Sequence, residues 1–242
     1  RRAALSGAAL AGLAVARSGA EDAAKTPVPV RIPAWYYQHF DADYSLDVPE
    51  RGFGGWRKAE LDFARDRMAL VCMHAWAAGQ TPSDFPGWWR CVPYIPRANR
   101  VLREVFPPLL EGVRAAGVPV FHVVGGGDYY KELPGYRHAA ARAQAPPEFE
   151  RIPGDAFRAR LDAFRAENGF TGAHNAEDVQ RGFSRLDFPD EARPHGDEGI
   201  AENAPQLFAL CKERGINHLV YCGFAINWCL LLSPGGMADM QK

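Results

Sequence analysis

Three continuous apolar runs of strand length constrain the fold of this sequence most. They occupy residues 68–73 (MALVCM), 118–124 (VPVFHVV) and 216–222 (INHLVYC). None of them alternates strictly between polar and apolar residues, which is typical of strands that are buried on both faces. Helical segments precede the second and third runs. This order favours a parallel sheet between two layers of helices, a three-layer α/β/α sandwich of Rossmann-like type.

Helix signals mark the segments between these runs. Apolar spacing predicts a helix over about 97–117, which Pro107 and Pro108 should kink or split and which Gly117 should end. A second helix is predicted at 203–215. Residues 128–190 form an irregular polar insertion, in which one amphipathic helix stands out at about 155–167. Asp155 is its expected N-cap.

The length and composition indicate one main domain with an extension. The chain has 242 residues, of which 47% are hydrophobic and 24% charged, the profile of a soluble globular protein. We place the domain at 65–242. Residues 25–64 are rich in Pro and aromatic side chains and predict an N-terminal arm that packs on the domain, with a strand or two. Such a sheet normally continues beyond residue 242, so we expect a truncated C-terminus.

Residues 1–24 have the pattern of an export signal. Two arginines open the sequence, no charge occurs from Ala3 to Ala16, and Ala14-Val15-Ala16 resembles a cleavage site. The pattern is that of a twin-arginine signal, cut within its start, which predicts an exported, periplasmic protein. The apolar run is too short for a comfortable membrane span. The mature form is therefore expected to have no membrane partner.

Charge and cysteine content exclude several classes of protein. The formal net charge of −1 gives no basic surface for nucleic acid. The five cysteines include no pair with zinc-finger spacing, so no structural metal site is expected. Core packing is the expected role of Cys72, Cys211 and Cys222, because free cysteine is among the most buried residue types.

The carboxyl ends of the strands are where an open parallel sheet binds ligands. Cys229 stands close after the third run, at the predicted start of a helix. The positive end of a helix dipole favours a thiolate, and helix N–H groups can stabilise an oxyanion. Both properties suit a cysteine nucleophile.

The same stretch carries a resemblance to a known family. GINHLVYCGFAINWCLLL resembles the nucleophile region of the isochorismatase-like cysteine hydrolases, which include nicotinamidases and N-carbamoyl amidohydrolases; Gly223 to Cys229 match its strand-to-helix corner. PxxLLEGVRAAGVPVFHV and DRMALVCM resemble its first helix with second strand and its first strand. The resemblance covers about residues 65–125 and 200–240.

The resemblance implies a cysteine hydrolase that cleaves an amide or related C–N bond of a small molecule through a covalent intermediate on Cys229. It also implies a cis peptide bond at Phe224–Ala225 and an oxyanion site of backbone N–H groups. It implies no organic cofactor, and oligomers are frequent in the family. The expected oxyanion residues are Phe224, Ala225 and Trp228.

Two positions depart from the family pattern. His74 occupies the place of the usual aspartate base, and no lysine occurs near 193–203, where the supporting lysine should fall. One interpretation is a rebuilt triad of Cys229, His74 and an acid, for which we choose Glu198. The alternatives are a catalytically inactive relative that binds a small molecule or protein, or a base elsewhere, such as Asp128.

The remaining expectations concern the pocket. Trp76, Asn227 and Asp128 are the expected substrate-binding residues, and Trp228 is expected to line the pocket as well. His122 lies inside the second run and is expected to be a core histidine with a hydrogen-bond partner. A metal near His74, His122 or Asp128 stays an alternative, because some nicotinamidases carry one.

Overall fold

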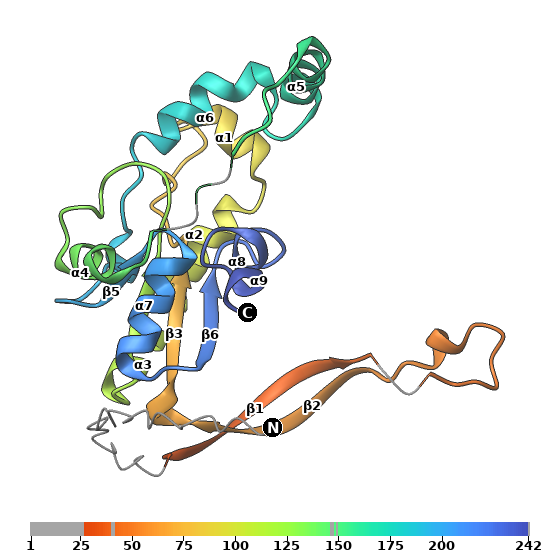
Figure 1. The fold of residues 1–242 in the computed structure, drawn as a ribbon, viewed down its shortest axis with the longest axis vertical. Coiled ribbons are helices and arrows are strands. Elements are labelled where there is room, and N and C mark those ends of the chain that lie inside the picture. Colours follow the sequence, from red (N-terminus) through yellow and green to blue (C-terminus); the bar gives the residue numbers. More distant parts are fainter. Residues whose placement is uncertain (1–26, 40–41, 146–147, 149, 242) are drawn as a thin grey trace, which may run out of the picture.

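The computed structural model describes residues 27–39, 42–145, 148 and 150–241, so the expected export signal at 1–24 lies outside the described residues. Its centre is a four-stranded parallel sheet in the order β5-β4-β3-β6 (Figure 1). The three predicted runs supply β3, β4 and β6, and β5 was not foreseen. The strands are β3 Met68–Met73, β4 Val120–Val123, β5 Gly199–Ala201 and β6 His218–Gly223.

Helices cover both faces of this sheet, so the mixed α/β fold is confirmed. On one face, Leu70 and Val120 pack against Leu102 of α2 and Leu110 of α3. On the other face, Val71, Met73 and Phe121 pack against the helices α4 and α7 through Ala139, Leu207 and Leu210. All residues of β3 and β4 are buried, as their unbroken apolar runs require. These helices are α2 Ile95–Glu104, α3 Phe106–Ala115, α4 Pro134–Arg142 and α7 Ala204–Arg214.

The predicted break in the first long helix is confirmed. The segment divides into α2 and α3 at Val105, two residues before the first of the paired prolines. Pro107 and Pro108 lie in the first turn of α3, where a missing N–H costs nothing because that group has no intrahelical acceptor. Both short helices pack on the same face of the sheet.

The segment 128–190 is more regular than its composition predicts. Besides α4 it contains α5 Ala156–Asn168 and α6 Ala176–Phe183. The prediction for α5 is confirmed: the Asp155 side chain accepts a hydrogen bond from the Arg158 N–H at 2.8 Å. The apolar residues of α5 are nevertheless exposed, which leaves one apolar face without cover. They are Phe157, Leu161 and Phe164.

The N-terminal arm is an antiparallel ribbon of β1 Pro29–Gln38 and β2 Gly55–Ala64, paired from Pro29↔Ala64 to Gln38↔Gly55. The expectation of a strand or two is confirmed, but the expected packing on the domain is wrong for most of the arm. Only the root contacts the sheet, where the Phe63 ring lies 5.7 Å from the ring of His218. The rest projects past β6 (Figure 1).

Shorter helices complete the described chain. None of the helices in this part of the sequence is both long and apolar enough to cross a membrane. The short α-helices are α1 Pro86–Cys91, α8 Cys229–Leu232 and α9 Met237–Met240, and the 3-10 helices are η1 Pro49–Gly52, η2 Arg65–Arg67, η3 Ala173–Asn175 and η4 Asp190–Ala192.

Candidate functional site

The carboxyl ends of β3 and β6 meet at the candidate site. His74 follows β3, and the segment from Phe224 to Cys229 follows β6. The two ends touch because Gly223 pairs with Met73 and has a φ of 129°. A Cβ at Gly223 would lie 1.9 Å from the Met73 carbonyl oxygen, so only glycine allows this approach. The peptide bond Phe224–Ala225 is cis, as the resemblance implies.

His74 and Cys229 line one cavity of about 170 Å³, together with Trp76 and Trp228. Most of its wall is aromatic or aliphatic. The sequence placed His74 and Cys229 after two of the three predicted strands, and the structure brings them to the same cavity. The other lining residues are Ala78, Trp88, Val92, Tyr94, Ile95, Ala98, Phe170, Thr171, Val179, Phe183 and Phe224.

His74 is buried and held in an unusual backbone conformation. Its φ of 49° is in the left-handed region, the one such value for a non-glycine residue among those the structure describes. Its N–H donates to the Val123 carbonyl at 2.9 Å, and its Nδ1 is buried without a hydrogen-bond partner in the described chain. Burial lowers the pKa of His74 from 6.5 to about 4. The ring is therefore neutral at pH 7 and able to accept a proton.

The expected oxyanion residues differ in whether their backbone N–H groups are free. The Phe224 N–H donates to the Met73 carbonyl at 3.1 Å, and the Trp228 N–H donates to the Ala225 carbonyl at 3.1 Å. Neither group is free for a ligand. Within the described chain, the N–H groups of Ala225 and Cys229 have no acceptor. Of the three expected oxyanion residues, Ala225 alone thus keeps a free backbone N–H, and the Cys229 N–H at the start of α8 is free as well.

The helix that begins at Cys229 is short. Cys229 is the first residue of α8, which has four residues. A helix dipole grows with the number of aligned peptide units. A helix of this length therefore stabilises a thiolate much less than a long helix does. The free N–H groups beside the sulfur are thus the more important electrostatic feature of this corner.

Tyr94 is a polar lining residue that the sequence did not single out. It lies half-buried directly before α2, and its hydroxyl makes no hydrogen bond to any residue that the structure describes. Burial, and then the nearby Cys229 sulfur, raise the pKa of Tyr94. The sequence signal that could have pointed to Tyr94 is its place in the Trp- and Pro-rich loop after β3, since such loops often carry functional residues.

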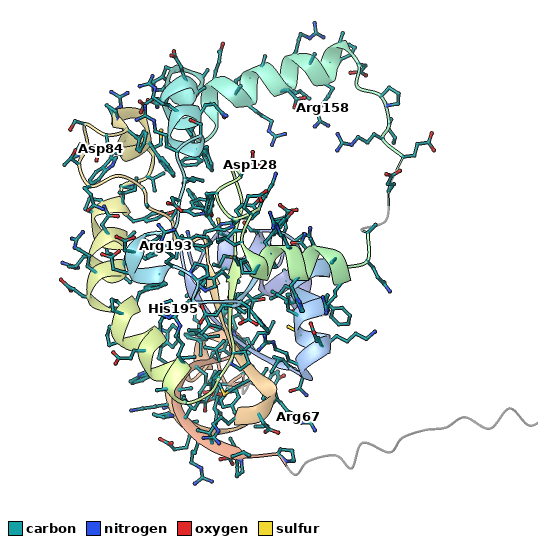
Figure 2. All side chains as sticks on the ribbon, turned by 90° about the vertical axis from the view of Figure 1, so that its left-hand side faces the viewer. Arg67, Asp84, Asp128, Arg158, Arg193 and His195 are labelled. Carbon is teal, nitrogen blue, oxygen red and sulfur yellow. The ribbon has the colours of Figure 1, made fainter. Side chains whose placement is uncertain are left out.

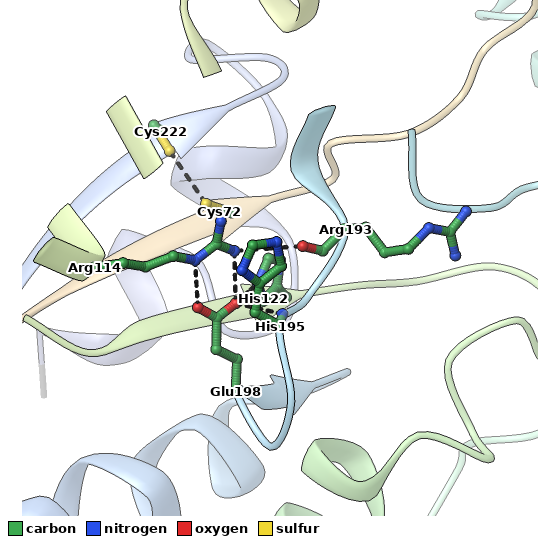
Figure 3. A network of polar contacts seen from close by, with 7 residues as sticks. All are labelled: Cys72, Arg114, His122, Arg193, His195, Glu198 and Cys222. Carbon is green, nitrogen blue, oxygen red and sulfur yellow. Dashed lines mark hydrogen bonds and ion pairs between the residues drawn. The ribbon is translucent and has the colours of Figure 1, made fainter. Parts of the chain in front are cut away.

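The structure does not bring Glu198, predicted as the catalytic acid, to the cavity. It lies before β5, at the amino ends of the strands, and it does not line the cavity. Arg114 donates to both of its oxygens, at 2.7 and 2.9 Å, and His122 lies 3.0 Å from one of them (Figure 3). The positive charge of Arg114 therefore balances the negative charge of the Glu198 carboxylate. The prediction of a hydrogen-bonded core His122 is confirmed.

The protonation states in this network follow from burial and partners. Burial alone would raise the pKa of Glu198, but the hydrogen bonds from Arg114 and His122 outweigh it and lower the pKa to about 2. Burial lowers the pKa of His122 more strongly than Glu198 raises it. His122 is therefore a neutral donor to the carboxylate, and the cluster is a structural anchor between α3, β4 and β5.

Two predicted substrate residues do not reach the cavity. Asp128 is exposed and pairs with Lys131 at 2.5 Å, well above His195 of the Glu198 network in Figure 2. Asn227 is exposed and is not among the lining residues. Both follow strand ends in sequence, but their loops turn outward. Trp76 and Trp228 do line the cavity, as predicted.

The cavity wall contains neither a carboxylate nor a lysine among the described residues. Its polar side chains are those of His74, Tyr94, Thr171 and Cys229, with the indole N–H groups of the tryptophans. Nowhere in the described ranges do three or more His, Cys, Asp or Glu side chains gather into a group that could hold a metal ion. The arrangement offers a thiol, a neutral imidazole and two free backbone donors.

Comparisons with known proteins add no relative. No protein-family model matches the chain, and no curated protein matches it.

Proposed function

We propose that this protein is a cysteine hydrolase of the isochorismatase-like, Rossmann-like type, which cleaves an amide or related C–N bond of a small molecule. The observation that carries the proposal is the shared cavity of Cys229 and His74, beside the free N–H groups of Ala225 and Cys229. Nucleophile, base and oxyanion donors are the three parts that acyl transfer needs.

The proposed reaction uses Cys229 and His74 as a couple. The Cys229 thiol gives its proton to His74, and the sulfur attacks the carbonyl carbon. The N–H groups of Ala225 and Cys229 stabilise the negative oxygen. The C–N bond breaks, the amine leaves with the proton from His74, and an acyl group remains on Cys229. His74 then deprotonates a water molecule that attacks the thioester carbon. The C–S bond breaks, the acid leaves, and the Cys229 sulfur takes the proton back from His74.

The cavity favours a small, flat and uncharged substrate. The lining contains no carboxylate, lysine or arginine, and His74 is neutral at pH 7, so an ionic group inside would lose its water without gaining a charged partner from these residues. An apolar cavity of ~150 Å³ holds a benzene molecule. A volume of about 170 Å³ therefore suits one ring with a short substituent.

The experiment is covalent trapping. We expect an acyl group on Cys229, located by mass spectrometry after incubation with p-nitrophenyl acetate, and release of amine from members of a panel of neutral primary amides. Cys229→Ala should lose both. Cys91→Ala is the matched control, because Cys91 is also a half-buried thiol but donates to the Thr171 carbonyl instead of lining the cavity. Acylation of another cysteine, or none, would contradict the proposal.

A second candidate function is binding without catalysis. The specific observation is that His74 is a weak base with a pKa of about 4 and has no carboxylate beside it in the cavity. A protein of this kind would bind a neutral aromatic molecule among the indole rings. Calorimetric binding of a neutral amide, with neither amine release nor acylation of Cys229, would favour this candidate.

A further inference from the structure

Two cysteines face each other across neighbouring strands of the sheet. Cys72 of β3 and Cys222 of β6 are register partners, and such partners on parallel strands point to the same face of the sheet. Their sulfur atoms lie 3.6 Å apart, although the residues are 150 positions apart in the sequence (Figure 3). Both are free thiols. Among the cysteines that the structure describes, this is the pair whose sulfur atoms are in contact.

The pair has an apolar side and an ionic side. Cys72 belongs to the core between the sheet and the helices α2 and α3, and Cys222 packs against that core. On its other side, Cys72 has His122 of β4 as register partner, and His122 contacts Glu198. Glu198 and Arg114 already bind each other. The second thiol is therefore the reactive neighbour of Cys72 (Figure 3).

The backbone spacing allows a bond between the two sulfur atoms. Neighbouring strands lie about 4.7–4.9 Å apart, within the range of about 4.4–6.8 Å that the Cα atoms of disulfide-bonded cysteines adopt. The Cβ atoms of a disulfide are about 3.5–4.5 Å apart, so the bond would draw the strands together by a few tenths of an ångström. Rotation of the two side chains supplies the rest of the approach.

We propose that Cys72 and Cys222 form an oxidation site, at which a hydroperoxide converts two thiols into one disulfide. In the first step a sulfur attacks an oxygen of the hydroperoxide and the O–O bond breaks. A sulfenic acid forms, and water or an alcohol leaves with the thiol proton. The second thiol then attacks this sulfur. The S–S bond forms, the S–O bond breaks, and water leaves with the second proton. The two thiols lose two electrons, which the O–O bond takes up.

The two cysteines have different parts in this reaction. Cys72 is 1% exposed, and its contact with Cys222, together with burial, raises its pKa. A thiol that stays protonated is a poor nucleophile toward a peroxide. Cys222 therefore attacks the hydroperoxide, and Cys72 resolves the sulfenic acid that forms on it.

The crosslink would lie directly behind the candidate site. Cys72 stands two residues before His74, and Cys222 stands one residue before Gly223, which pairs with Met73. That contact has no room to spare, because a Cβ at Gly223 would lie 1.9 Å from the Met73 carbonyl oxygen. Drawing the strands together at the cysteines therefore displaces the chain after Gly223 relative to His74. Oxidation should thus slow the reaction of Cys229, a consequence that rests on the proposed function.

The test is oxidation of the full chain with hydrogen peroxide. Free thiols are then blocked with iodoacetamide in urea, and linked peptides are mapped by mass spectrometry. We expect a Cys72–Cys222 crosslink that dithiothreitol removes. The urea midpoint of unfolding should also be higher in the oxidised chain, because the crosslink closes a long loop. Cys222→Ala should lose both effects. Cys211→Ala is the matched control and should keep both, since Cys211 is a buried thiol on the opposite face of the sheet.

The peptide map of the wild type decides the oxidation site without reference to any variant. Cys72 and Cys222 that are still alkylated separately after oxidation would overturn the proposal. Conversion of Cys222 to a sulfinic acid while Cys72 stays a thiol would overturn it as well, because Cys72 would then have failed to resolve the sulfenic acid.

A second measurement tests the effect on the candidate site. Peroxide also oxidises Cys229, so the exposure is kept short and the acylation rate by p-nitrophenyl acetate is expressed per remaining Cys229 thiol. This rate should fall about 10-fold in the oxidised wild type and stay unchanged in oxidised Cys222→Ala. An unchanged rate in wild type with the crosslink mapped would overturn the coupling to the site. No acylation in the reduced wild type would instead contradict the proposed function and with it the coupling, whereas the peptide map would still decide the oxidation site.

Discussion

The imidazole ring of His74 stacks on the indole ring of Trp76, with ring centroids 4.4 Å apart and planes inclined by 13°. Trp76 is itself fixed, because its Nε1–H donates to the Tyr129 hydroxyl at 3.0 Å. The stack excludes water from one face of the imidazole. It therefore accounts for part of the burial that keeps His74 neutral, and it fixes the ring orientation relative to the cavity.

Replacing Trp76 by Ala should alter both protonation and reactivity. Water would reach His74 and raise its pKa from about 4 toward the ordinary 6.5. The ring would also lose its fixed orientation, for which we expect a fall of about 10- to 100-fold in the rate of Cys229 acylation. NMR titration of the His74 ring checks the first effect. Trp56→Ala, an exposed indole on the ribbon, is the control and should change neither quantity.

The pH dependence of acylation should follow the low pKa of His74. A protonated imidazole cannot accept the thiol proton, so the rate should be retained as pH falls below 6.5 and be lost near pH 4. The measurement is kcat/KM with p-nitrophenyl acetate between pH 3 and 8. An acidic limb centred near 6.5 would mean that His74 is hydrated in the reacting state.

Stability should depend on pH through the same group. The folded pKa of His74 is depressed, so the unfolded chain binds more protons between about pH 4 and 6.5. The contribution of His74 to stability is thus complete above pH 6.5 and decreases as pH falls to about 4. Urea unfolding at several pH values measures it. In His74→Phe the decrease in stability between pH 6.5 and 4 that is due to His74 should disappear. The control His138→Phe, at a partly exposed position, should retain that decrease.

The sheet could be predicted from the sequence because buried parallel strands are unbroken apolar runs. β5 could not be predicted, since it has only three residues and the charged residues Asp197 and Glu198 directly before it interrupt the apolar pattern. The ribbon was recognised as a stranded arm, but its projection away from the domain could not be foreseen. Its composition resembles that of a packed segment because it is rich in apolar and aromatic residues, and sequence does not show what covers them.

The residues of the candidate site that follow strand ends could be predicted from the sequence. Those that reach the cavity through tertiary packing could not. His74 and Cys229 follow adjacent strands, so topology brings them together. Phe170, Thr171 and Phe183 reach the cavity from the segment 128–190, whose contacts are tertiary. Glu198 lies away from the cavity because it binds Arg114, which is 84 residues distant in the sequence. A carboxylate chosen by elimination carries no information about such a partner.

Glu198→Gln should destabilise the fold without affecting the thiol. Loss of the charge leaves Arg114 and the buried His122 with a weaker acceptor, at a cost of about 2–4 kcal/mol in the free energy of unfolding. In the wild type, the contribution of Glu198 is present above its ordinary pKa of 4.5 and is lost as pH falls toward 2. Glu213→Gln, an exposed carboxylate beside His138, is the control and should change little. Slower acylation of Cys229 in folded Glu198→Gln would reinstate a catalytic role.

Gly223→Ala should disrupt the corner that joins the two strand ends. The new Cβ would overlap the Met73 carbonyl oxygen, and the φ of 129° is strained for any residue with a side chain. Relief requires β6 to move away from β3, which displaces Phe224 to Cys229 relative to His74. We expect a loss of about 3 kcal/mol or more in stability and of about 100-fold in the rate of acylation.

The control variant Gly215→Ala isolates the effect of positive φ from that of the steric overlap. Gly215, at the end of a helix, also has positive φ but has open space around a Cβ. It should lose stability alone, by about 1 kcal/mol. Equal behaviour of the two variants would show that the contact of Gly223 with Met73 does not position the site.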